Sequence, residues 1–143
     1  IVIKAEEKDI SDIYQIGTVS FSDAWREETI RNDMKGGHSC YFIAKLAKKV
    51  IGYGCFWFIA DEAQLMNIGV LPEYRRMGAA EKILKQGLEE AAERHMEVIF
   101  LEVRVSNLPA QSLYRKYNFQ TVSVRQDVYE LPRENGYIMS RKV

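Results

Sequence analysis

The chain of 143 residues is poor in cysteine and histidine, with only two of each. Cys40 and Cys55 lie in apolar segments without metal-ligand spacing, a pattern typical of reduced thiols in the core of a cytoplasmic protein. His38 and His95 form no HxxxH motif and no cluster with cysteine. We therefore expect no metal site, zinc included.

The sequence also lacks long apolar runs and an excess of charge of either sign. No apolar run reaches the roughly 18 residues of a membrane span, and no basic segment precedes a shorter one, so we expect neither a span nor a signal peptide. Twenty basic residues balance twenty acidic ones, which argues against a general nucleic-acid or membrane surface. Since the first residue is Ile1 rather than Met, we expect the extreme N-terminus to be missing.

Nothing in the sequence divides the chain into parts. There is no internal repeat, low-complexity tract or Pro/Gly/Ser-rich linker, and the three prolines are scattered. The composition, 47% hydrophobic and 28% charged, is ordinary for a globular protein. We predict one domain over residues 1–143, long enough to bury a substantial core. The sequence leaves the oligomeric state open.

Hydrophobic periodicity and turn residues predict helices and strands in a mixed order. Strands are expected at residues 1–4, 39–46, 50–59, 64–71, 98–105, 119–127 and 136–142. Helices are expected after a cap at Asp9, at 27–34, at 78–95 and from Ser106-Asn107 to Tyr117, with a loop at 131–135. Asn118 is suited to a left-handed helix exit. The order strand, helix, strand over 64–105 predicts a right-handed crossover with two parallel strands, and ligands of such units bind beyond the carboxyl ends of the strands.

The segment NIGVLPEYRRMGAAE, from Asn67 to Glu81, leads from a strand into the start of a helix. The N–H groups of a first helical turn have no intrahelical acceptor, and with the helix dipole behind them they bind anions. Small residues at 78–80 allow a pyrophosphate to approach, and Gly78 tolerates any φ. Arg75 and Arg76 add mobile positive charge. An ordinary loop with two solvated arginines explains the same residues, so both interpretations stay open.

Three polar residues further along the chain are candidates for chemistry. Glu102 interrupts the apolar strand at 99–105, where an unpaired charge is costly. It is either a general base or the partner of Arg104 in a surface ion pair. Tyr114 is either catalytic or part of a helical core stripe, and Asn107 is explained by its role as a helix cap.

Several motifs together carry a resemblance to a known family. RRMGAA resembles the acetyl-CoA pyrophosphate loop of the GNAT N-acetyltransferases, Q/R-x-x-G-x-G/A, with Arg75, Gly78 and Ala80 on its defined positions. Residues 61–70, the run LEVRVSN at 101–107, and Leu113-Tyr114 with Phe119 are similar to the ribosomal-protein alanine N-acetyltransferases, the RimI type. Similar stretches at 21–25 and 125–129 extend the resemblance over almost the whole chain.

The resemblance implies a fold and a site. The expected fold is a single GNAT-like α/β domain, with a mixed, mainly antiparallel twisted sheet flanked by helices and a central parallel pair that splays to admit acetyl-CoA. Glu102 is implied as general base and Tyr114 as general acid. The implied acetyl-CoA contacts come from the backbone of Ile68 and Val70, the side chain of Asn107 and the loop residues Arg75, Arg76, Met77, Gly78, Ala79 and Ala80. The implied acceptor is a protein N-terminus, such as the alanine of an S18-type ribosomal protein, with Trp25 and Tyr129 lining the peptide site or serving only as packing residues.

The chemistry of acetyl transfer favours these residue types. A neutral amine must attack the thioester, so a carboxylate has to remove its proton directly or through water. The departing thiolate can take a proton from a phenol, and a backbone N–H near Val70 can stabilise the oxyanion. No metal and no covalent enzyme intermediate is needed. A GNAT enzyme for a small amine and a non-catalytic acetyl-CoA-binding module are the alternatives.

Three positions depart from the family pattern. Ala24 stands where proline usually precedes the tryptophan, Ala80 is the larger of two allowed residues, and Asn118 replaces a glycine. None of the three removes a proposed catalytic group. Alanine in place of proline at position 24 affects the predicted shape of the loop that contains Trp25.

Overall fold

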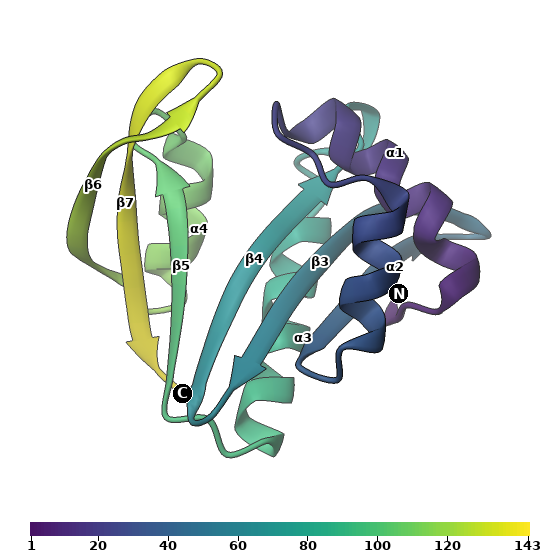
Figure 1. Ribbon diagram of the computed structural model, residues 1–143, viewed down its shortest axis with the longest axis horizontal. Coiled ribbons are helices and arrows are strands. Elements are labelled where there is room, and N and C mark those ends of the chain that lie inside the picture. The colour runs from purple at the N-terminus through teal and green to yellow at the C-terminus, as the bar shows by residue number, and fades with distance from the viewer.

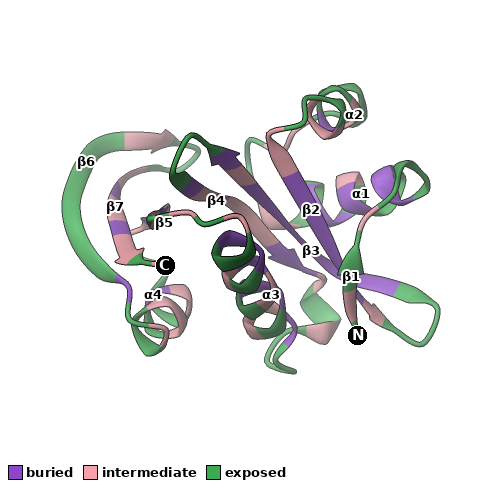
Figure 2. Ribbon diagram, turned by 90° about the horizontal axis from the view of Figure 1, so that it is seen from below, coloured by how far each residue is buried: buried purple, intermediate pink, exposed green.

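A computed structural model describes all residues, 1–143, and contains one seven-stranded sheet in the order β1-β2-β3-β4-β5-β7-β6. The strands are β1 (Val2–Lys4), β2 (Ser39–Leu46), β3 (Lys49–Ile59), β4 (Glu62–Val70), β5 (Val98–Arg104), β6 (Gln120–Glu130) and β7 (Arg133–Lys142). The α-helices are α1 (Ile10–Ser20), α2 (Glu27–Lys35), α3 (Ala79–Glu93) and α4 (Leu108–Lys116), and the 3₁₀ turns are η1 (Glu7–Asp9) and η2 (Pro72–Tyr74). Helices cover both faces of the sheet, α1 and α2 on one and α3 and α4 on the other (Figure 2). No helix combines the length and apolar character needed to cross a membrane.

The centre of the sheet opens between β4 and β5. These two strands are parallel, whereas every other neighbouring pair is antiparallel. Their pairing runs from Glu62↔Val98 to Leu65↔Leu101, and beyond that point the strands diverge (Figure 1). Met66, which has no partner on β3, forms a bulge where the divergence begins. Because a bulge bends its strand, it turns the remainder of β4 away from β5. The predicted parallel pair and its splay are confirmed.

Two apolar clusters hold the helices to the sheet. The larger lies between α3 and the sheet and includes Phe42 and Phe56, whose rings meet edge to face at 5.9 Å. At Gly87 a Cβ atom would lie 2.0 Å from Cζ of Phe56, so glycine is required for α3 to approach β3 this closely. The smaller cluster packs α1 and α2 on the opposite face. Both cysteines are buried in these clusters as free thiols, as predicted.

Most predicted elements form, and the differences lie at their ends. The predicted loop at 131–135 is shorter, because β6 continues to Glu130 and β7 begins at Arg133. Asp9 occupies the predicted N-cap position of α1, but its carboxylate makes no capping bond to that helix and instead accepts from the N–H of Glu6, just before η1, at 2.8 Å. Asn107 does cap α4, and Asn118 has the predicted left-handed backbone, with φ of 70°.

A polar cluster that the sequence analysis missed joins α2 to the sheet. The carboxylate of Asp33, 9% exposed, accepts from the hydroxyl of Tyr41 at 2.7 Å and from Nε1 of Trp57 at 3.1 Å. Nε2 of His38 lies 3.1 Å from its other oxygen. Trp57 in turn packs against Trp25, with ring centroids 6.1 Å apart. Asp33 therefore fixes the position of a tryptophan that supports the α1–α2 loop.

We expect Asp33→Ala to lower the free energy of unfolding by about 3 kcal/mol and Tm by about 10 °C, because buried donors lose their acceptor. Thermal and urea denaturation measure the change. Asp61→Ala, at an exposed turn, is the matched control and should change stability by less than about 0.5 kcal/mol. Equal effects of the two substitutions would show that the cluster contributes little.

Candidate active site

An open cleft of about 1300 Å³ lies where β4 and β5 diverge. Its walls come from the α1–α2 loop, β3, β4, the start of α3, β5, α4 and β6. Most predicted site residues line it together: Trp25, Ile68, Val70, Arg75, Arg76, Gly78, Ala79, Ala80, Glu102, Asn107, Tyr114 and Tyr129. Met77 does not line it, and its side chain is among the exposed apolar ones, so only its backbone could contribute.

One end of the cleft is formed by the start of α3. The first main-chain bond of this helix runs from the N–H of Lys82 to the carbonyl of Gly78 at 3.1 Å, and no side chain caps the helix. The N–H groups of residues 79–81 therefore have no acceptor within the helix. Gly78 has φ of 84°, a conformation that costs other residues energy. Arg75 lies beside this end of the cleft, where its Nε donates to the carbonyl of Val70 at 3.0 Å.

We expect Gly78→Ala to weaken acetyl-CoA binding about tenfold, because alanine at positive φ costs about 1–2 kcal/mol and the loop would relax away from its binding conformation. No atom lies within 4 Å of the added Cβ, so a clash cannot account for the loss. Gly37→Ala is the matched control, since Gly37 has φ of 78° and equally open surroundings. Calorimetric titration with acetyl-CoA should distinguish the two variants. Equal dissociation constants would contradict a role for this loop.

The open edge of β4 presents main-chain groups to the cleft. The N–H of Leu71 donates to the carbonyl of Ile51 on the β3 side at 2.8 Å. Because main-chain groups alternate along a strand, those of Val70 and Ile68 point the other way, toward the cleft. The carbonyl of Val70 accepts a hydrogen bond from Nε of Arg75. The N–H of Val70 and both groups of Ile68 are left for a ligand.

Glu102 lies on β5 just beyond the last residue that pairs with β4. Its side chain is 25% exposed, and Oε2 is 3.2 Å from a guanidinium nitrogen of Arg125 on β6. The alternative of an ion pair with Arg104 is wrong, since Arg104 pairs with Glu134 instead. Gly136 stands between these strands, and a Cβ there would lie 3.2 Å from Cγ of Glu102. Val128 and Tyr129 of β6 lie still closer to that position, so the missing side chain leaves room for all three residues.

Tyr114 reaches the cleft from α4, and the end of that helix holds it in place. The N–H of Phe119 donates to the carbonyl of Tyr114 at 3.0 Å, and the N–H of Asn118 donates to that of Arg115 at 3.0 Å. This is a Schellman motif, which the left-handed Asn118 permits. The rings of Tyr114 and Phe119 meet edge to face at 5.8 Å. Burial raises the pKa of Tyr114 above its ordinary value, so its phenol stays protonated beyond neutral pH.

Asn107 combines a structural role with a place in the cleft. Its Oδ1 accepts from the N–H of Ala110 at 3.2 Å, which caps α4. The residue lines the cleft, and its Nδ2 is not used by the cap. The helix-cap interpretation and a ligand contact are therefore compatible.

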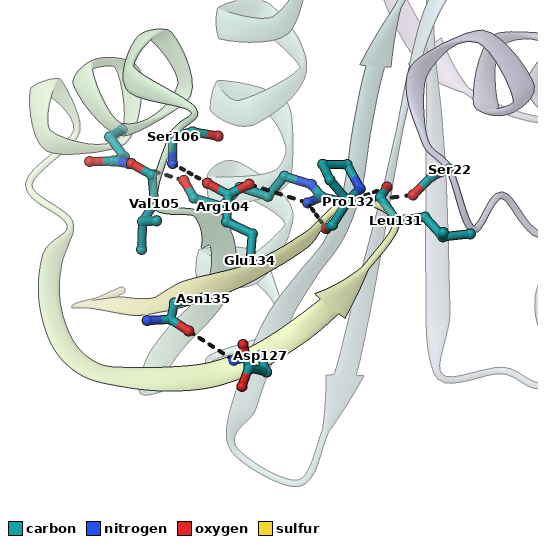
Figure 3. A network of polar contacts seen from close by, with 10 residues as sticks. Ser22, Arg104, Val105, Ser106, Asp127, Leu131, Pro132, Glu134 and Asn135 are labelled. Carbon is teal, nitrogen blue, oxygen red and sulfur yellow. Dashed lines mark hydrogen bonds and ion pairs between the residues drawn. The ribbon is translucent and has the colours of Figure 1, made fainter.

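Arg104 holds the β6–β7 loop beside the cleft, a role that the sequence did not indicate (Figure 3). Its guanidinium donates to the carbonyls of Pro132 and Leu131 at 2.8 and 3.0 Å and to Glu134 at 3.2 Å. It also stacks on the ring of Tyr129, 4.3 Å from the centroid. Burial and then the charge of Glu102 raise the pKa of Tyr129 to about 12. Tyr129 is thus a fixed, neutral wall of the cleft.

The cleft thus joins free helix amides, an open strand edge, a carboxylate and a phenol. Residues 8–119 match the family model described as "Acetyltransferase (GNAT) family". The chain belongs to the GNAT family of acetyltransferases. The predicted family and fold class are confirmed.

Relatives of this GNAT chain align over nearly its full length. The putative [ribosomal protein bS18]-alanine N-acetyltransferase of Bacillus subtilis is 32% identical over 92% of this chain and 88% of its own length. An N-alpha-acetyltransferase of Saccharolobus solfataricus is 31% identical over 96% of this chain and 89% of its own. The crystal structure of the ribosomal-protein-S18-alanine N-acetyltransferase from Escherichia coli superposes with a TM-score of 0.92 at 28% identity, covering 100% of this chain and 93% of that one.

Proposed function

We propose that this enzyme transfers the acetyl group of acetyl-CoA to the α-amino group of a protein N-terminus. The N-terminal alanine of ribosomal protein bS18 is the proposed acceptor. The observation that carries the proposal is that Glu102 and Tyr114 line one cleft whose far end is the uncapped start of α3. The names of the aligned bacterial relatives support the choice of acceptor.

The donor half of the cleft suits the coenzyme. The amides of residues 76–80 would hold the pyrophosphate, and the unpaired charges of Arg75 and Arg76 would assist them. The amides of the pantetheine arm would pair with Ile68 and the N–H of Val70, in the manner of an added strand. Nδ2 of Asn107 would donate to the same arm. The thioester would then lie between β4 and β5, beside Glu102 and Tyr114.

The proposed reaction is direct transfer in a ternary complex. The neutral amine attacks the thioester carbonyl and forms the N–C bond, while Glu102 takes the amine proton directly or through water. The N–H of Val70 would stabilise the oxyanion. The C–S bond then breaks, and the thiolate of coenzyme A takes a proton from Tyr114. Because burial raises the pKa of Tyr114, this proton is present throughout the neutral and mildly alkaline range.

The acceptor would enter from the end of the cleft opposite α3. Trp25 lines that side from the α1–α2 loop, and Tyr129 lines it from β6. Trp57 and Arg104 hold these two side chains in place. Two aromatic walls, one from a loop and one from a strand, suit an extended peptide, which needs a channel that is open at its outer end.

A competition assay tests the proposed function. Enzyme and acetyl-CoA are mixed with a bS18 N-terminal peptide, the same peptide with a blocked N-terminus, and spermidine as a small amine. We expect acetylation only at the free α-amino group, located by mass spectrometry. Preferred acetylation of spermidine would indicate a small-amine GNAT enzyme, and acetyl-CoA binding without transfer to any amine would indicate a binding module.

A further inference from the structure

Asp23, in the α1–α2 loop, is a carboxylate without a cationic partner at the acceptor end of the cleft. The other acidic residues that line the cleft are paired. Glu102 contacts Arg125 at 3.2 Å, and Glu81 contacts Lys116 at 2.8 Å. The donor end of the cleft carries unpaired positive charge instead, because Arg75 and Arg76 have no acidic partner. The cleft is thus positive where a pyrophosphate would lie and negative where the acceptor would enter.

Asp23 also lines a side pocket of about 240 Å³ that opens beside the cleft. Its lining comes from the end of α1, the α1–α2 loop and the β6–β7 loop, together with Arg104 and Tyr129. Neither Glu102 nor Tyr114 belongs to this lining, so the pocket lies away from the proposed reacting centre. Its volume suits one amino-acid side chain rather than a drug-sized molecule. A side chain bound in it would belong to a part of the acceptor beyond the reacting amine.

The negative charge of this pocket is not cancelled by its one cationic wall residue. The guanidinium of Arg104 is already paired with Glu134 at 3.2 Å and donates to two loop carbonyls. Asp23 therefore supplies the unbalanced charge. Asp23 also contributes to the raised pKa values of two tyrosines that line the cleft, behind larger causes: burial and Cys55 for Tyr53, and burial and Glu102 for Tyr129.

The lining of this pocket also offers apolar surface beside Asp23. It comes from the ring of Tyr129 and the side chains of Leu131 and Pro132. An apolar wall next to an unpaired carboxylate suits an aliphatic stem that ends in a charged donor.

We propose that this side pocket binds a cationic side chain that follows the N-terminal residue of the acceptor, with Asp23 as its ion-pair partner. The inference rests on the proposed function and narrows it to protein N-termini with an arginine or lysine at the second or third residue. The stem of that side chain lies against Tyr129, and its head group reaches Asp23. Asp23 is a specificity residue and takes no part in the transfer of the acetyl group.

The test compares Ala-initiated peptides that carry arginine, glutamine or glutamate at position two or three. Arginine is used because its side chain accepts no acetyl group. For the wild-type enzyme at low ionic strength we expect kcat/KM to be about tenfold higher for the arginine peptide than for the glutamine peptide, and the ratio to fall with added salt. In Asp23→Asn the ratio should approach one, and in Asp23→Lys the glutamate peptide should become the better substrate. The matched control Asp61→Asn should keep the wild-type ratio.

The possible failures can be told apart. If the wild-type enzyme acetylates all the peptides with equal efficiency, or if Asp23→Asn keeps the preference, the side pocket is not a cation site and the proposed function stands. If no peptide is acetylated although acetyl-CoA binds, the proposed function fails and the acceptor subsite fails with it. Calorimetric titration of the enzyme–coenzyme A complex with the arginine and glutamine peptides compares their dissociation constants without turnover.

Discussion

Glu102→Gln is expected to lower kcat/KM for an N-terminal peptide by about 10²- to 10⁴-fold at pH 7, because the amide cannot remove the proton of the attacking amine. The α-amino group has an ordinary pKa near 8, so the amine deprotonates unaided in alkali and the deficit should shrink above about pH 9. A pH–rate profile of both enzymes from about pH 6 to 10 measures this convergence. An unchanged rate at pH 7 would reject Glu102 as the base.

The ion pair with Arg125 offers a second explanation for the same loss, since Glu102→Gln also breaks it. Arg125→Gln is the matched control, because it removes the ion pair and keeps the carboxylate. If Glu102 acts as the base, Arg125→Gln should retain most of the activity and show no convergence in alkali. Equal losses in the two variants would mean that the ion pair, and not the proton transfer, is what the reaction requires.

Tyr114→Phe is expected to lower kcat by about 10- to 10³-fold and to leave the dissociation constant of acetyl-CoA within about twofold, because the phenol would act only on the departing thiolate. The raised pKa of Tyr114 keeps the proton on the phenol to higher pH than in a free tyrosine, so the wild-type rate should not fall between pH 8 and about 10 through loss of this proton. Single-turnover kinetics and calorimetry separate transfer from binding. A large loss of affinity with normal turnover would contradict the acid role.

Tyr117→Phe is the control for this substitution. Tyr117 ends the same helix, does not line the cleft, and donates its hydroxyl hydrogen to Glu81 instead. Loss of this hydroxyl should lower the free energy of unfolding, because a hydrogen bond between α3 and the end of α4 is lost, and should change kcat little. A matching fall in kcat would indicate that α4 packing, rather than the phenol of Tyr114, governs the rate.

The local features of the site were predictable, because each depends on residues adjacent in the chain. Gly78 has the positive φ for which a glycine at a helix start is suited, and Asn118 has the left-handed conformation expected at the exit of α4. Asn107 caps α4 as its position before Leu108-Pro109 indicates. The parallel pair followed from the order strand, helix, strand. Motif spacing then led to the family, which the family model confirms.

The partners of the charged residues were not predictable, because sheet register decides them. The sequence suggested Glu102 and Arg104 as a pair two residues apart, yet each pairs with a residue 23 or 30 positions away. β7 lies between β5 and β6, and its Gly136 pairs with Arg104 on one side and with Arg125 on the other. The two arginines are therefore at the same level of the sheet. The loop held by Arg104 arises in the same way, whereas the cluster around Asp33 arises where α2 packs on β2 and β3.

By itself the sequence determined the family, the order of the elements and the backbone of the α3 start, because these depend on propensities and spacings within a few residues. Only the tertiary structure decided which charges are neutralised and which remain free, because that depends on which distant segments of the chain the fold brings together. Asp23 illustrates the difference: in the sequence it is one of twenty acidic residues, and in the folded chain it is left without a partner beside a pocket.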